Sequence, residues 1–101
     1  MREFYRVVRI FRKELPEYRF KVRRLKLAKN YYGTCEFNDG VFLISLDEKM
    51  NEDMTIHILI HELAHMISWN EPGDIHNSKW GIAYSKIYRI FINKYINGDP
   101  K

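Results

Sequence analysis

Residues 55–69 read TIHILIHELAHMISW, an apolar segment interrupted by three histidines and one glutamate. Asn51 precedes it and two acidic residues follow in the first turn, which is typical of a helix N-terminus. The sequence NEPG at residues 70–73 is typical of a helix end. We therefore predict a helix from about residue 52 to Trp69. Because it is apolar on nearly all sides, we expect it to be buried.

Within this helix, His61-Glu62-Leu63-Ala64-His65 matches the HExxH pattern. Residues four apart on a helix share a face, so both imidazoles can bind one Zn²⁺. Glu62 is offset by about 100° around the helix axis, from where it can act as general base on a zinc-bound water. The pattern therefore predicts a catalytic zinc site. The alternative is a core cluster of these polar side chains that is satisfied without metal.

A catalytic zinc normally has three protein ligands, so a third must come from outside the helix. His76 is the first choice, because a turn and a short loop could fold it back over the helix. Glu71 and Asp74 are the alternatives. His57 lies one turn before the motif on the same face, and we interpret it as a supporting or structural residue. Tyr84 could stabilise an oxyanion, although core packing is the simpler interpretation.

The N-terminal part of the chain predicts one helix and one strand. Apolar residues at helical spacing indicate a helix that ends before Leu15-Pro16, because the residue before a proline is disfavoured in a helix. Tyr18, Phe20 and Val22 then alternate with basic residues, as in a strand. The alternation slips at Arg23-Arg24, where we predict a bulge.

Two further strands are predicted at residues 31–37 and 41–46, joined by the turn signal Asn38-Asp39-Gly40. Ser78 is predicted to cap a last helix over residues 79–96. The order is helix, three strands, helix, helix. We therefore predict an α+β fold in which residues 1–101 form a single domain with a three-stranded antiparallel sheet.

The net charge of +4 is unevenly distributed along the chain. Residues 1–30 contain eleven Lys/Arg and three Asp/Glu, a balance of +8, and the remainder has a balance of −4. The excess of basic residues in the N-terminal 30 residues suggests an anionic partner, with nucleic acid as the first candidate. The residues we expect to contact it are Arg19, Lys21, Arg23 and Arg24. The alternative is a solvated basic face that has no partner.

No stretch is long and apolar enough for a membrane span, and the N-terminus lacks the apolar middle of a secretory signal. We therefore expect a cytoplasmic protein without a membrane partner. The single cysteine, Cys35, cannot form an internal disulfide, which agrees with a reducing compartment. We interpret Cys35 as a small buried side chain.

These features resemble the SprT-like zinc metallopeptidases, the group that includes the catalytic domain of Spartan. The resemblance covers roughly residues 20–95 and rests on Gly33-Thr34-Cys35, the strand at 42–46, the HExxH helix, and His76 with Trp80. It implies a zincin-like domain and a peptidase acting on DNA-associated proteins. It also implies that the zinc ligands are His61, His65 and His76 and that the base is Glu62. The family often has glycine after the third histidine, where this chain has Asn77.

Together, these features predict a zinc-dependent metallopeptidase with a protein or peptide substrate and Zn²⁺ as its cofactor. The competing interpretation belongs to another class of protein. It is a basic nucleic-acid-binding module whose zinc site is structural or vestigial. The two are distinguishable, because binding through phosphate contacts weakens steeply as salt rises.

Overall fold

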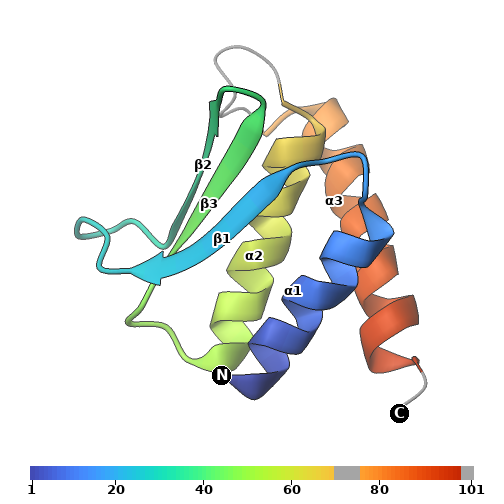
Figure 1. The fold of residues 1–101 in the computed structure, drawn as a ribbon, viewed down its shortest axis with the longest axis horizontal. Coiled ribbons are helices and arrows are strands. Elements are labelled where there is room, and N and C mark those ends of the chain that lie inside the picture. The colour runs from blue at the N-terminus through green and yellow to red at the C-terminus, as the bar shows by residue number, and fades with distance from the viewer. Residues whose placement is uncertain (70–75, 99–101) are drawn as a thin grey trace.

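The computed structural model describes residues 1–69 and 76–98 of the chain. Within these residues the elements follow the predicted order, and the last helix continues as a π-helical segment (Figure 1). The elements are α1 (Arg2–Glu14), β1 (Phe20–Leu25), β2 (Gly33–Asn38), β3 (Val41–Asp47), α2 (Glu52–Ile67), α3 (Ser78–Ile90) and η1 (Phe91–Ile96). The predicted α+β class is confirmed. None of the described helices is long and apolar enough to cross a membrane.

The sheet is mixed, so the prediction of an antiparallel sheet is wrong. β3 lies in the centre, with β2 antiparallel to it on one side and β1 parallel to it on the other. The chain reverses direction between β1 and β2 and again between β2 and β3, which leaves β1 and β3 pointing the same way. They become neighbours because β3 is the most buried strand and takes the centre of the sheet. Alternating residues identify strands, but they do not say which strand is central.

β1 pairs with β3 along all six of its residues, so the bulge predicted at Arg23-Arg24 is wrong. Arg24 instead lies at one of the alternate positions of β1 whose side chains face the helices. It is accommodated there because its Nη2 donates hydrogen bonds to the carbonyl oxygens of Glu48 at 3.1 Å and Met50 at 3.4 Å. A charged side chain at an inward position therefore finds backbone acceptors where the strand reaches the end of the sheet.

The turn between β2 and β3 is confirmed. Asp39 and Gly40 have φ angles of 51° and 79°, the left-handed conformations that a two-residue hairpin turn requires. The strand predicted at residues 31–37 begins later, at Gly33. At the other end of the domain, α1 stops before Leu15-Pro16 as predicted.

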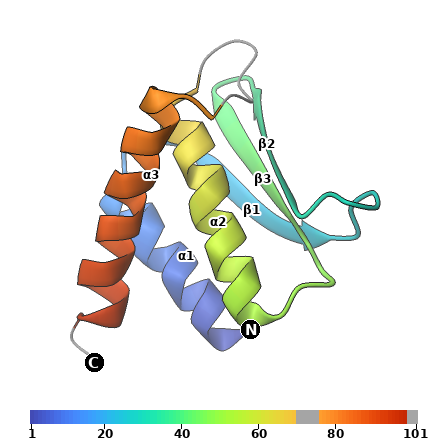
Figure 2. The same ribbon diagram turned by 180° about the vertical axis from the view of Figure 1, so that it is seen from behind.

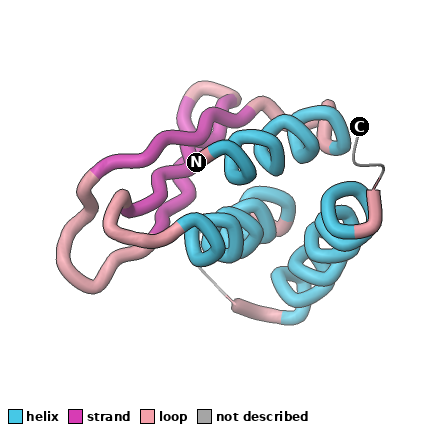
Figure 3. Tube along the Cα trace, turned by 90° about the horizontal axis from the view of Figure 1, so that it is seen from below, coloured by secondary structure: helices cyan, strands magenta, loops and turns pink. Residues whose placement is uncertain are grey.

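All three helices lie on one face of the sheet, and α2 is the central one (Figures 2 and 3). α2 contacts β2 and β3 on one side, and it also contacts α1 and α3. The predicted burial of the HExxH helix is therefore confirmed. Its fully buried apolar residues meet those of α1 and β3 in one core, which includes Phe4, Val7, Phe11, Ile44, Leu46, Leu59, Ile60 and Leu63.

The last helix begins one residue away from the predicted cap. Asn77, rather than Ser78, is the N-cap of α3, and its side-chain oxygen accepts a hydrogen bond from the backbone N–H of Trp80 at 3.0 Å. Helical structure then continues through η1 to Ile96, in agreement with the predicted extent. The cap fixes where α3 begins, and His76 is the residue just before the cap.

Candidate metal centre

α2 carries two histidines on one face, and burial of the helix holds them in place. An Asn51 cap starts the helix, with its side chain accepting from the backbone N–H of Met54 at 2.9 Å. His61 lies one turn before His65. His65 is only 3% exposed, whereas His61 is half-buried. Their ring centroids are 4.9 Å apart, so both imidazoles face the same small region.

The structure brings His76 to these two histidines, although it lies eleven residues after His65 in the chain. Its Nε2 is 3.0 Å from the Nε2 of His65 and 3.1 Å from the Nε2 of His61. The three nitrogens all lie within 4.8 Å of one another. Three residues predicted from the sequence as ligands are therefore assembled at one point by α2 and the start of α3.

The other residues considered as ligands do not join this cluster. Glu71 and Asp74 lie outside the described residues. His57 is exposed, and its ring packs edge-on against Phe91 at 6.5 Å. Among the described residues, His57 is therefore a surface residue near η1 and is not one of the three histidines whose nitrogens converge.

The donor set fits a metal ion of the kind that imidazoles prefer. Zn–N bonds of about 2.0–2.1 Å at tetrahedral angles place ligand nitrogens roughly 3.3 Å apart. The two shorter Nε2–Nε2 distances, 3.0 and 3.1 Å, are within a few tenths of an ångström of that value. Two neutral imidazole nitrogens this close either share a proton or point their lone pairs at a common cation. Three histidines can thus hold a metal ion here and leave a coordination position open.

The indole ring of Trp80 packs against all three imidazoles. Its ring centroid lies 5.1 Å from that of His61, 5.6 Å from that of His65 and 4.7 Å from that of His76. The Asn77 cap that binds the Trp80 backbone also sets this position. In the sequence, Trp80 stands out only through the resemblance to SprT-like enzymes, which rests in part on His76 with Trp80. An indole on one side limits the directions from which water can reach the nitrogens.

Tyr84 is the next aromatic residue along α3 after Trp80. Its ring packs against Trp80 at 5.1 Å and against Tyr88 at 6.0 Å. An aromatic stack therefore runs along α3, with Trp80 as the member that reaches the histidines. This arrangement agrees with the packing interpretation of Tyr84.

The side chain of Glu62 lies between α2 and β2. It is 6% exposed, a low value for a carboxylate. A Cβ placed on Gly33 would be 3.1 Å from Glu62 Oε2 and 2.6 Å from Ile58 Cγ2. The backbone of β2 therefore approaches the glutamate so closely that a side chain at this position would displace Ile58 or Glu62. The sequence alone contained no signal for this contact.

Cys35 is next on the same side of β2. Burial raises the pKa of the Cys35 thiol to about 12, and the negative charges of Glu62 and Glu36 add to the effect. A thiol with this pKa stays protonated at neutral pH and is a poor nucleophile and a poor metal ligand. Cys35 is half-buried and in contact with the core, as expected for a small structural side chain.

The four basic residues predicted to contact nucleic acid do not share one surface. Lys21 and Arg23 extend from the face of β1 opposite the helices, and the Nε of Arg23 donates to Ser45 Oγ at 2.8 Å. Arg24 faces the helices and is bound to backbone carbonyls. Arg19 is exposed just before β1. The structure thus separates Arg24 from the other three.

Comparison with known proteins identifies no relative, since no family model, no curated protein and no solved structure matches the chain. The chemistry of the site is therefore inferred from its own residues. These provide three converging imidazole nitrogens, a buried carboxylate one residue along the same helix, and the indole ring of Trp80.

Proposed function

We propose that this protein is a zinc-dependent metallopeptidase of the zincin type. The observation that carries the proposal is the convergence of the Nε2 atoms of His61, His65 and His76 beside the buried Glu62. Shared protons could explain single pairs of these nitrogens, but a common cation explains why all three meet at one point. The choice of zinc follows from an all-imidazole set with an open position, which is typical of catalytic zinc.

His61, His65 and His76 would hold the zinc, which when bound would supply Lewis acidity and a water molecule with a pKa lowered to about 7. Glu62 would serve as the general base that takes a proton from the attacking water and passes it to the leaving amine. The low exposure of Glu62 and the backbone of β2 beside it hold the carboxylate in one orientation. Trp80 excludes bulk water from one side of the histidines.

A peptide substrate is favoured by the position of β2. In the described part of the chain, β2 pairs with β3 alone, so its other edge has main-chain groups available. The contact between Gly33 and Glu62 places the start of this edge beside the general base. An extended peptide can add to such an edge through main-chain hydrogen bonds. DNA-associated proteins are the substrate class that the resemblance to SprT-like enzymes suggests.

The first experiment measures zinc content and peptide hydrolysis on protein purified without a histidine tag. We expect about one zinc per chain, the stoichiometry of a single catalytic site, and cleavage of unfolded casein that stops when the metal is chelated. Glu62→Gln should keep the zinc and lose about 10²–10⁴-fold in rate, the usual contribution of a general base. His76→Ala should lose most of the zinc, whereas His57→Ala should keep it.

Two results would count against the proposal. Absence of zinc from the wild-type protein, even after zinc is added back, would remove the metal centre. Equal activity of Glu62→Gln and wild type would show that any hydrolysis does not use this glutamate.

A further inference from the structure

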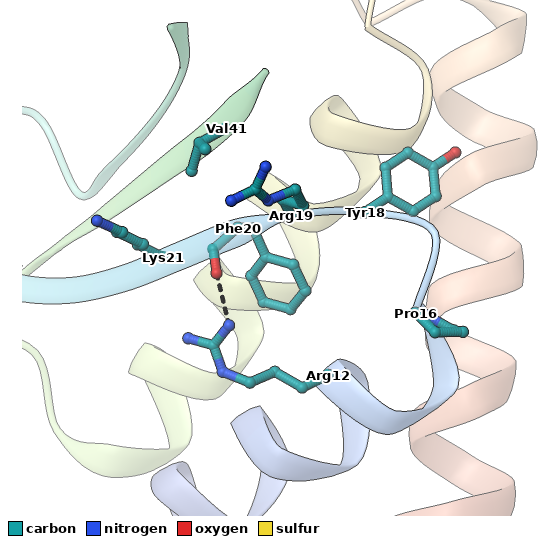
Figure 4. Close-up of a pocket in the computed structure, with 7 residues that line it drawn as sticks. All are labelled: Arg12, Pro16, Tyr18, Arg19, Phe20, Lys21 and Val41. Atoms are coloured by element: carbon teal, nitrogen blue, oxygen red, sulfur yellow. Dashed lines mark hydrogen bonds between the residues drawn. The ribbon is translucent and has the colours of Figure 1, made fainter. Parts of the chain in front are cut away.

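A second polar site lies where the end of α1 meets the start of β1 (Figure 4). It is an open cavity of about 430 Å³. Three cations line it, one from α1, one just before β1 and one in β1, and no carboxylate does. These residues, with the other side chains around them, are Arg12, Arg19, Lys21, Pro16, Tyr18, Phe20 and Val41. We call this site the basic pocket.

Arg12 is held in position by uncharged groups. Its Nη1 donates a hydrogen bond to the carbonyl oxygen of Phe20, and its guanidinium lies 4.7 Å from the centre of the Phe20 ring. Figure 4 shows Arg12 reaching β1 from the helix below, while Arg19 extends from the residue before the strand and Lys21 from the strand itself. Neither partner of Arg12 neutralises its charge, so the guanidinium is ordered and remains available to an anion.

The cations of the basic pocket have no acidic partner in the part of the chain that the structure describes. The ion pairs recorded within residues 1–69 and 76–98 join Arg6 to Glu3 and Lys49 to Asp47. Arg12, Arg19 and Lys21 are all exposed. Three positive charges around one cavity create a field that attracts a multiply charged anion.

We propose that the basic pocket binds a phosphate of a nucleic-acid backbone. The pocket offers two guanidinium groups and one ammonium group, and arginine binds phosphate in a bidentate manner while lysine adds a point charge. Further cations flank the pocket at exposed positions, namely Arg9 and Lys13 on α1 and Arg23 on β1. A row of cations matches an anion that repeats along a strand better than it matches a single free phosphate.

This assignment changes the set of residues predicted from the sequence. Arg12 joins the site because the fold brings the end of α1 to β1. Arg24 leaves it because its guanidinium is bound to the carbonyls of Glu48 and Met50. The basic pocket lies at the β1 edge of the sheet, and Glu62 lies beside β2 at the opposite edge. Nucleic acid and a peptide can therefore occupy the protein at the same time.

The test measures binding of the full chain to a fluorescein-labelled DNA duplex and to the corresponding single strand by anisotropy, at several salt concentrations. The variant Arg12→Gln/Arg19→Gln/Lys21→Gln removes the pocket cations. A matched control, Lys86→Gln/Arg89→Gln/Lys94→Gln, removes the same charge from three exposed cations that line another open cavity, of about 390 Å³, on α3 and η1. The double variant Arg19→Gln/Lys21→Gln leaves the packing of Arg12 on Phe20 intact, so it remains informative if the triple variant unfolds.

We expect the wild type to bind at least one of the two DNAs. The pocket variant should lose at least about tenfold in affinity at moderate salt. The slope of log affinity against log salt should become less steep by the amount expected for the loss of about one to three phosphate contacts. The control should stay within about twofold, because net charge acts weakly at a distance in salt. The double variant should fall between wild type and the triple variant.

Three outcomes would overturn the proposal. The first is a wild-type protein that binds neither DNA. The second is an equal loss of affinity in the pocket variant and the α3 control, which would make net charge the cause. The third is binding of pyrophosphate in the pocket without binding of either DNA, which would identify a free phosphate as the ligand. Zinc content should be unchanged in both variants, so failure here is distinguishable from failure of the metal centre.

Discussion

Replacing Gly33 with alanine should slow peptide hydrolysis without releasing the metal. The backbone of Gly33 is not left-handed, so alanine brings no backbone strain of its own. The added methyl group would instead lie 2.6 Å from Ile58 Cγ2 and 3.1 Å from Glu62 Oε2. Both neighbours belong to α2, the helix that carries the histidines. Either β2 moves away from α2 or these two side chains change position.

The size of the effect follows from these two distances. An ordinary carbon–carbon contact is about 3.5–4.0 Å, so the contact with Ile58 requires a relative movement of roughly 1 Å. Overpacking of this kind costs about 1–3 kcal/mol of stability. A misplacement of about 1 Å in a catalytic group can cost about 10²-fold in rate. We therefore expect kcat/KM to fall by about 10- to 100-fold and the melting temperature to fall by several degrees.

The assay combines three measurements on one preparation: steady-state hydrolysis of a peptide, zinc per chain, and thermal unfolding. Zinc should stay near the wild-type value, because the histidine nitrogens meet at a point that includes neither Gly33 nor Ile58. The matched control is Gly81→Ala in α3, where an added Cβ has no neighbour within 4 Å. This control should be as stable as the wild type or slightly more stable, since alanine favours helix over glycine.

Two results would refute the reasoning. Unchanged kcat/KM in Gly33→Ala, together with a lowered melting temperature, would show that the position of the Glu62 carboxylate does not limit the reaction. Loss of zinc from Gly33→Ala would show that β2 supports the histidines directly, so that the slower rate could no longer be assigned to Glu62.

Three further predictions concern single residues. Asn77→Ala should lower stability by about 1 kcal/mol through loss of the α3 cap, whereas Ser78→Ala should change it little; equal effects in thermal unfolding would place the cap elsewhere. Tyr84→Phe should keep kcat within about twofold, because the ring packs against Trp80, and a loss of about 10²-fold or more would assign the hydroxyl to oxyanion stabilisation. Cys35 should react slowly with a thiol reagent in the native protein at pH 8 and quickly after unfolding. The reason is that its thiolate forms only as the pH approaches its raised pKa of about 12. A fast reaction of the native protein would contradict the burial of this thiol.

Local patterns in the sequence were enough to predict every helix and strand of the described chain. Helical periodicity and a proline defined α1, and an Asp-Gly turn defined the hairpin of β2 and β3. The spacing of His61 and His65 placed both on one face of α2 before any tertiary contact was known. These features depend on residues within one or two turns of each other, and short-range geometry is nearly the same in any fold.

The tertiary structure decided what depends on contacts between distant residues. It made β1 parallel to the central β3, because burial of whole strands, rather than their alternation, sets their order. It bound Arg24 to carbonyls at the end of the sheet and brought Arg12 beside Phe20. It also placed the bare backbone of Gly33 against Glu62. No sequence pattern reports these contacts, since each forms only when segments that are far apart in the chain pack into one core.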